Sequence, residues 1–225
     1  MSAREDVLTA IRAGLGAGAI DPLLVKRQAL MLLKVPQAIR PALPQGSVVD
    51  AFAARLMSPK VSATVDRIAH ATQFPLAVQR YHESCRLPPF IYLQPSDRLT
   101  SLDWSGFDIT AELTSEQVVG VSVARWGIAE TGSLVLHSGP DTPVLASFLP
   151  LHHIVLIRAR DVVGYLEDYA AAFARSGNPF PRNVNIITGA SGTTDIEGIL
   201  VRGAHGPQFL HVVIADYDRD FSARL

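Results

Sequence analysis

Two glycine-rich segments in the second half of the chain carry the side chains best suited to chemistry. The first is Glu130-Thr131-Gly132-Ser133, in which a carboxylate and two hydroxyl groups surround a glycine. The second, residues 184–207, holds hydroxyl and carboxylate groups and the imidazole of His205. A carboxylate at a glycine turn can act as a nucleophile or general base, and an imidazole can exchange a proton near neutral pH.

The second segment predicts a strand, a tight turn and the start of a helix. Val184 to Thr188 is typical of a buried strand, Gly189 to Gly192 of a turn, and Thr193 to Glu197 of a first helical turn. Such a junction points backbone N–H groups and the positive end of a helix dipole at one place, where an anion can bind. The alternative is a plain connection in which Asp195 and Glu197 only offset the dipole. The glycines match neither a P-loop nor a dinucleotide fingerprint.

The first segment leads into the apolar run Leu134 to Leu136, which predicts a β-hairpin or a sharp bend into a strand. Glu130 at this corner either faces a ligand or is solvated, and its spacing leaves both alternatives open. A metal site could combine Asp195 and His205 with Glu130 or His153. No spacing requires such a site, so we assign no metal ligands.

The composition indicates a soluble, cytoplasmic chain without its own redox centre. A formal net charge of −1 over 225 residues, with no Lys/Arg run, argues against nucleic-acid binding. No apolar run approaches the ~20 residues of a membrane span, and the acidic start of the chain is unlike a signal peptide. Cys85 is the only cysteine, which excludes an intrachain disulfide and a four-thiolate cluster. Its place at a predicted helix end favours an inert thiol over a nucleophile.

The pattern of helices and strands divides the chain into a helical arm with a Pro-rich connector, residues 1–45, and an α/β domain, residues 46–225. The arm has two predicted helices with apolar sides, which must pack on their own core or on a second subunit; a homodimer is one outcome. Short strands alternate with helices in the domain, which predicts a largely parallel sheet covered on both faces. The predicted helices are residues 49–57, 75–85 and 161–174, and the predicted strands are residues 60–65, 90–93, 118–124, 154–157 and 209–215.

Three ordered segments resemble the LUD-domain family, whose best-known members are lactate utilization proteins of the LutC/YkgG type. They are Gly127 to Val135, Ser147 to Pro150 with His153-Ile154, and Gly189 to Glu197 continuing into Gly203 to Pro207. The chain departs from the family pattern where Ala190 replaces a proline and where Val144 and Gly192 stand in place of arginines found in some members. These departures bear on any anionic ligand.

The resemblance implies a three-layer α/β/α fold like that of NagB, RpiA and the CoA transferases. It also implies a part in the oxidation of L-lactate to pyruvate, together with iron–sulfur partner proteins. We therefore expect no cofactor in this chain and iron–sulfur clusters on its partners. Its own role would be to bind a small organic acid or to dock those partners.

The resemblance also directs the assignment of site residues to a polar cleft at the strand ends, where open α/β sheets bind ligands. The catalytic candidates are Glu130 and His205. The ligand-binding candidates are Thr131, Gly132, Ser133, Gly189, Ser191, Thr193, Asp195, Glu197 and Gly206. An alternative is a stand-alone transferase- or isomerase-like enzyme in which Glu130 is the nucleophile or base and backbone amides stabilise an oxyanion. A third is an assembly protein whose glycine turns hold no ligand.

Overall fold

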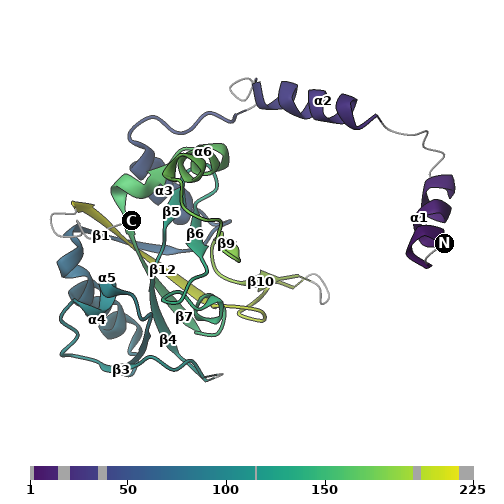
Figure 1. Cartoon of the computed structure of the whole chain (residues 1–225). Helices are drawn as coiled ribbons and strands as arrows, with labels where there is room; N and C mark the ends of the chain where they lie inside the picture. The colour runs from purple at the N-terminus through teal and green to yellow at the C-terminus, as the bar shows by residue number, and fades with distance from the viewer. Residues whose placement is uncertain (1–2, 15–20, 35–39, 115, 195–198, 218–225) are drawn as a thin grey trace. The chain divides into compact units, whose positions relative to one another are not determined.

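Two units make up the chain, Met1–Ala42 and Leu43–Leu225 (Figure 1). The computed structural model describes residues 3–14, 21–34, 40–114, 116–194 and 199–217. The sequence predicts a boundary after residue 45, and this division falls after Ala42.

In its described residues the first unit forms the two helices that the sequence predicts for the arm, α1 (Ala3–Gly14) and α2 (Pro22–Lys34). The Asp21 carboxylate accepts a hydrogen bond from the Leu23 amide at 2.9 Å, so it caps the second helix. No side chain of α1 is buried, and the described apolar side chains of both helices are exposed. The arm therefore presents uncovered apolar surface.

A six-stranded parallel sheet forms the centre of the second unit (Figure 1). Each neighbouring pair of strands is parallel. In sheet order, the strands are β1 (Thr64–His70), β12 (Phe209–Tyr217), β7 (His152–Arg158), β4 (Val119–Val123), β2 (Phe90–Leu93) and β3 (Asp108–Thr110). All residues of β4 and β7 are buried, as expected of parallel strands covered on both faces. The predicted α/β fold with a mostly parallel sheet is confirmed.

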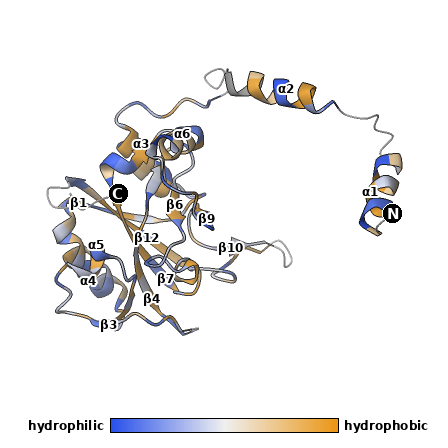
Figure 2. Ribbon diagram, viewed as in Figure 1, coloured by the Kyte–Doolittle hydropathy of each residue, from blue (hydrophilic) through white to orange (hydrophobic). Residues whose placement is uncertain are grey.

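Two apolar clusters hold the helices against this sheet. On one face, α4 (Phe74–Cys85) packs through Phe74 and Val78 onto the sheet residues Val121 and Ile154. On the other, α3 (Val48–Leu56) packs through Phe52 onto residues of β7 and β12. In Figure 2, β7 and β12 are mostly hydrophobic in colour, as expected of strands that are covered on both faces. Pro75 lies in the first turn of α4, as predicted from the preference of proline for that position.

A second, four-stranded sheet, which the alternating pattern did not predict, lies between the main sheet and α6 (Leu166–Ser176). Its strands in order are β8 (Val162–Val163), β5 (Trp126–Ile128), β6 (Ser133–His137) and β9 (Val184–Ile187). The β5–β6 hairpin confirms the predicted hairpin at Glu130. A Cβ on Gly127 would lie 2.8 Å from Ile157 and 2.9 Å from Phe52, so glycine permits the close approach of the two sheets.

Four local predictions are wrong. The strand predicted at residues 60–65 lies at Thr64–His70, because residues 58–62 form a turn closed by the Ser62 amide on the Ser58 carbonyl. The helix predicted at residues 161–174 begins at Leu166, because Val162–Val163 pairs with β5. The Val184 strand is only partly buried, since β9 is the edge of the smaller sheet. The helix start predicted at Thr193 is instead a ribbon, β10 (Gly192–Thr193) paired with β11 (Val201–Arg202).

Candidate functional site

The order of strands in the main sheet reverses between β2 and β4. From β2 the chain moves outward to the edge strand β3, whereas from β4 it moves to β7 on the opposite side. In open α/β sheets, ligands bind in the crevice outside the carboxyl ends of the strands at such a reversal. The segments that follow β2 and β4 are therefore the first place to look for a site.

A cleft of about 380 Å³ lies at this position. Its walls come from the segments after β2 and β4, from the loop after β6, and from residues near the end of α6 and the loop that follows it. The lining residues are Gln94, Ser96, Arg98, Val123, Arg125, His137, Ser138, Gly139, Pro140, Asp141, Thr142, Phe173, Asn178, Pro179, Phe180 and Pro181. The volume falls within the range of known small-molecule sites.

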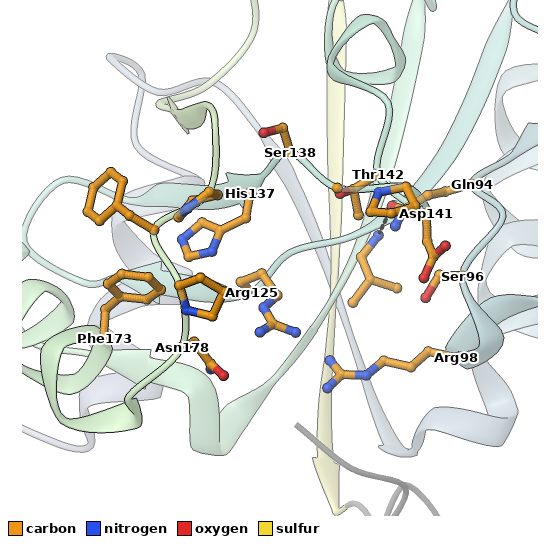
Figure 3. Close-up of a pocket in the computed structure, with 16 residues that line it drawn as sticks. Gln94, Ser96, Arg98, Arg125, His137, Ser138, Asp141, Thr142, Phe173 and Asn178 are labelled. Atoms are coloured by element: carbon orange, nitrogen blue, oxygen red, sulfur yellow. Dashed lines mark hydrogen bonds between the residues drawn. The ribbon is translucent and has the colours of Figure 1, made fainter.

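Two arginines extend into the cleft from different segments (Figure 3). Arg98 lies in the short helix α5 (Asp97–Thr100), and Arg125 follows β4, where its amide donates to the Val135 carbonyl at 2.8 Å. Among the residues that the structure describes, no carboxylate forms an ion pair with Arg125; its guanidinium carbon lies 5.8 Å from the centre of the Trp126 ring. Asp141 is the only acidic residue in the described lining, so the cleft has a net positive charge suited to an anion.

Gln94 fixes the floor of the cleft. Its backbone amide donates to the Val121 carbonyl, and its side-chain oxygen accepts a hydrogen bond from the Val123 amide, both at 3.0 Å. The side chain is 3% exposed. These bonds join the carboxyl ends of β2 and β4. They therefore fix the relative position of the two segments that carry Arg98 and Arg125.

His137 contributes a neutral imidazole to the wall. A hydrogen bond of 2.8 Å joins its Nε2 to the hydroxyl of Tyr169, and its ring packs against Trp126 and Phe173. Burial, with a further contribution from the Arg125 guanidinium, lowers the pKa of His137. The neutral ring can donate a hydrogen bond to a ligand, or accept one from it, without adding charge to the cleft.

The second glycine-rich segment lies near the amino ends of the strands of the main sheet, away from the cleft. The Ser191 amide donates to the carbonyl of Pro207, which precedes the amino end of β12, and Gly189 packs against Val61, which precedes β1. These residues therefore lie at the amino ends of β12 and β1 and not at the carboxyl ends, and their binding of a ligand stays a prediction. This placement follows from the unpredicted second sheet. Because β9 runs antiparallel to β6, the turn after β9 lies beside the start of β6 and near the amino ends of the main sheet.

Hydrogen bonds join the two glycine-rich segments. The Ser133 hydroxyl lies 2.6 Å from the hydroxyls of both Thr131 and Thr188, and Ser133 is 1% exposed. This chain of hydroxyl groups crosses from the start of β6 to the residue after β9. We call these residues the hydroxyl chain.

Three predicted glycines have structural reasons to be glycine. Gly132 and Gly189 have φ of +70° and +81°, a region that favours glycine, and each packs against backbone, of Arg55 and Val61 respectively. A Cβ on Gly206 would lie 3.3 Å from the Cβ of Ser191, so these two candidates are neighbours. Their roles in ligand binding stay predictions.

The two catalytic candidates are not joined by any hydrogen bond or ion pair within the described part of the chain. Glu130 is partly buried, and its amide donates to the Gly164 carbonyl at 3.0 Å. His205 is exposed in the loop before β12. Thr193 lies in β10, whereas Asp195 and Glu197 lie outside the described residues. In the described residues no group of three or more His, Cys, Asp or Glu side chains could hold a metal ion.

His152 and His153 are the first two residues of β7, and Cys85 lies at a helix end, as the sequence predicts. His152 and His153 point to opposite faces of their strand: His152 Nδ1 lies 2.9 Å from the Tyr81 hydroxyl, and His153 Nε2 lies 2.6 Å from the Ser122 hydroxyl. Both are hydrogen-bonded structural residues. Cys85 is exposed at the last residue of α4.

The sequence analysis missed Arg98, Arg125 and His137. One signal could have found Arg125: a charged residue directly after an apolar strand marks the carboxyl edge of a sheet. Arg98 could not have been found this way, because only the order of strands shows that β2 and β4 are neighbours at the reversal.

Comparisons with known proteins agree with this architecture. A crystal structure of a DUF162 family protein from Deinococcus radiodurans matches with a TM-score of 0.53 and 19% identity, over 77% of this chain and 99% of that one. Within the described residues, no helix is long and apolar enough to cross a membrane.

Curated relatives match over part of their length. Uncharacterized protein YkgG of Escherichia coli (strain K12) is 35% identical over 102 residues, 44% of each chain. Lactate utilization protein C of Geobacillus sp. (strain WCH70) is also 35% identical over 102 residues, 44% of this chain and 42% of that one. The chain thus spans less than half the length of these relatives. The LUD domain matches residues 94–215, which is more than half of the chain, and so the chain belongs to the LUD domain family.

Proposed function

We propose that this chain is a cytoplasmic component of lactate utilization whose cleft, beyond the carboxyl ends of β2 and β4, binds a small organic acid anion. One observation carries the proposal: Arg98 and Arg125 extend into a cleft at the strand-order reversal of the sheet (Figure 3). The names of the relatives supply the class of acid, since several are called lactate utilization protein C.

The chemistry of the cleft suits a 2-hydroxy or 2-oxo acid. A guanidinium group binds a carboxylate through two parallel hydrogen bonds, which gives both affinity and orientation. The neutral imidazole of His137 and the hydroxyl of Ser96 offer hydrogen bonds to the oxygen on the second carbon. The chain would thereby hold the acid and orient it.

The electrons of the reaction would leave through partner proteins. Oxidation of L-lactate to pyruvate releases two electrons and two protons, and the single cysteine of this chain cannot form a four-thiolate cluster. We therefore assign the redox step to iron–sulfur partner proteins and the binding of the acid, or the docking of those partners, to this chain.

Binding of L-lactate and pyruvate to the Arg125→Gln variant tests the proposal. We expect both acids to raise the melting temperature of the wild-type chain and the variant to bind them at least about tenfold more weakly, because a charged hydrogen bond is lost. Arg175→Gln removes the same charge from an exposed position on α6 outside the cleft and should bind like the wild type. Equal binding by both variants would contradict the proposal.

A second candidate function rests on the hydroxyl chain beside Glu130. Three hydroxyl groups linked at 2.6 Å next to a partly buried carboxylate could serve a stand-alone transferase- or isomerase-like enzyme, with Glu130 as nucleophile or base. This candidate uses a different part of the fold from the cleft, so the two can be tested separately.

A further inference from the structure

The cleft has an aromatic wall. Phe180 lines the cleft and is 77% exposed, and its ring meets Phe173 edge to face, with centres 5.4 Å apart and planes at 89°. Phe173 is itself buried against Trp126 and Tyr169. This geometry is a favoured one for aromatic pairs, so the exposed ring rests on a rigid support.

Two prolines flank that ring. Pro179 and Pro181 also line the cleft, and proline fixes its own φ and restricts the residue before it. Phe180 therefore lies in a stiffened segment. An exposed aromatic ring held this way beside a cavity differs from a single apolar side chain scattered on a surface.

The volume of the cleft also favours a ligand larger than lactate. At about 380 Å³ the cleft falls within the range of sites that bury most of a drug-sized ligand. Lactate has six non-hydrogen atoms and fills only part of that space. Phe180 and its two flanking prolines add apolar surface to the same lining that holds Arg125.

We infer that the ligand of this cleft is a carboxylate that carries an apolar ring: the carboxylate lies between Arg98 and Arg125, and the ring lies against Phe180. The inference rests on the proposed function, because it assumes that the arginines hold the anion. It narrows the proposed class of ligand, a small organic acid anion, to an acid that carries an apolar ring.

A matched pair of acids tests the inference, L-lactate and L-3-phenyllactate, which share the 2-hydroxy carboxylate and differ by a phenyl group. We expect calorimetry on the full chain to show phenyllactate binding roughly tenfold more tightly, because burial of the ring adds apolar contact. Phe180→Ala should remove this difference in affinity between the two acids. Phe90→Ala is the control, since Phe90 is 47% exposed at the amino end of β2 and does not line the cleft.

The possible outcomes distinguish a failure of the ring inference from a failure of the proposed anion site. If lactate binds in a way that depends on Arg125 but phenyllactate binds no more tightly, the ring inference alone is wrong. The same holds if Phe180→Ala weakens both acids equally. If neither acid binds the wild-type chain, the proposed anion site fails and the inference fails with it.

Discussion

Single residues set the charge of the cleft. Arg125 has no ion-pair partner in the described residues, and the nearby His137 is kept neutral by burial and by the arginine itself. The hydrogen bond between His137 Nε2 and the Tyr169 hydroxyl fixes the ring without giving it charge. A carboxylate that enters would therefore meet guanidinium groups as its main cationic partners.

Glu130→Gln distinguishes catalysis from a structural role at the hydroxyl chain. If Glu130 is a nucleophile or base, a host that carries the variant should lose growth on L-lactate while the protein keeps its melting temperature. Loss of the melting transition would instead identify a structural residue. Normal growth with a folded protein would contradict the catalytic role, and Glu167→Gln, an exposed change on α6, serves as the control.

Buried histidines predict loss of stability in mild acid. Burial lowers the pKa of His153 to about 4, and its Nδ1 has no hydrogen-bond partner among the described residues. In the unfolded chain the imidazole of His153 takes up a proton near pH 6.5, whereas in the folded chain it stays neutral down to about pH 4. The free energy of unfolding is therefore at its full value above pH 6.5 and falls as the pH drops toward 4. The loss from this one group is about 3 kcal/mol at pH 4.

Urea denaturation between pH 7.5 and 4 measures this effect. His211 should add to it, since burial also lowers its pKa to about 4. In His153→Gln the dependence of the unfolding free energy on pH should become shallower, although the variant is less stable throughout. An unchanged slope would show that His153 does not titrate as stated.

Elements of secondary structure explain which predictions succeed. Phe90–Leu93 and Val184–Ile187 were found because a β-branched or aromatic run between turn residues is a local signal. The second sheet was missed because pairing of β6 with β9 joins residues about 50 positions apart, and no local pattern records that contact. The cleft depends on the same kind of information, which is why neither its place nor Arg98 could be predicted.

The turn after β9 provides a test of backbone geometry. A Cβ on Gly189 would overlap the carbonyl oxygen of Val61, whereas Gly177 has a similar positive φ with nothing within 4 Å. We expect Gly177→Ala to cost about 1 kcal/mol of unfolding free energy and Gly189→Ala clearly more. Chemical denaturation compares the two. Equal costs would mean that the contact with Val61 does not constrain the turn.

At the scale of the whole molecule, the arm and the proposed partners belong to one experiment. Anaerobic affinity purification from lactate-grown cells should recover iron-bearing, cysteine-rich proteins, detected by mass spectrometry and an iron assay. Light scattering on the same samples should show a homodimer for the full chain if the exposed apolar faces of α1 and α2 pair. A variant that lacks residues 1–42 should then be a monomer. Recovery of an iron-free, partnerless chain would favour a stand-alone enzyme.

The strand β6 separates two surfaces by a fixed distance. Ser133 at its start belongs to the hydroxyl chain, and His137 at its end lines the cleft, so their Cα atoms lie about 13 Å apart at roughly 3.3 Å per residue. Sites this far apart with no shared contact make additive contributions to free energy. A double variant at Arg125 and Glu130 should therefore show the sum of the two single effects, and a partner bound at the glycine turns would leave the cleft open to its acid.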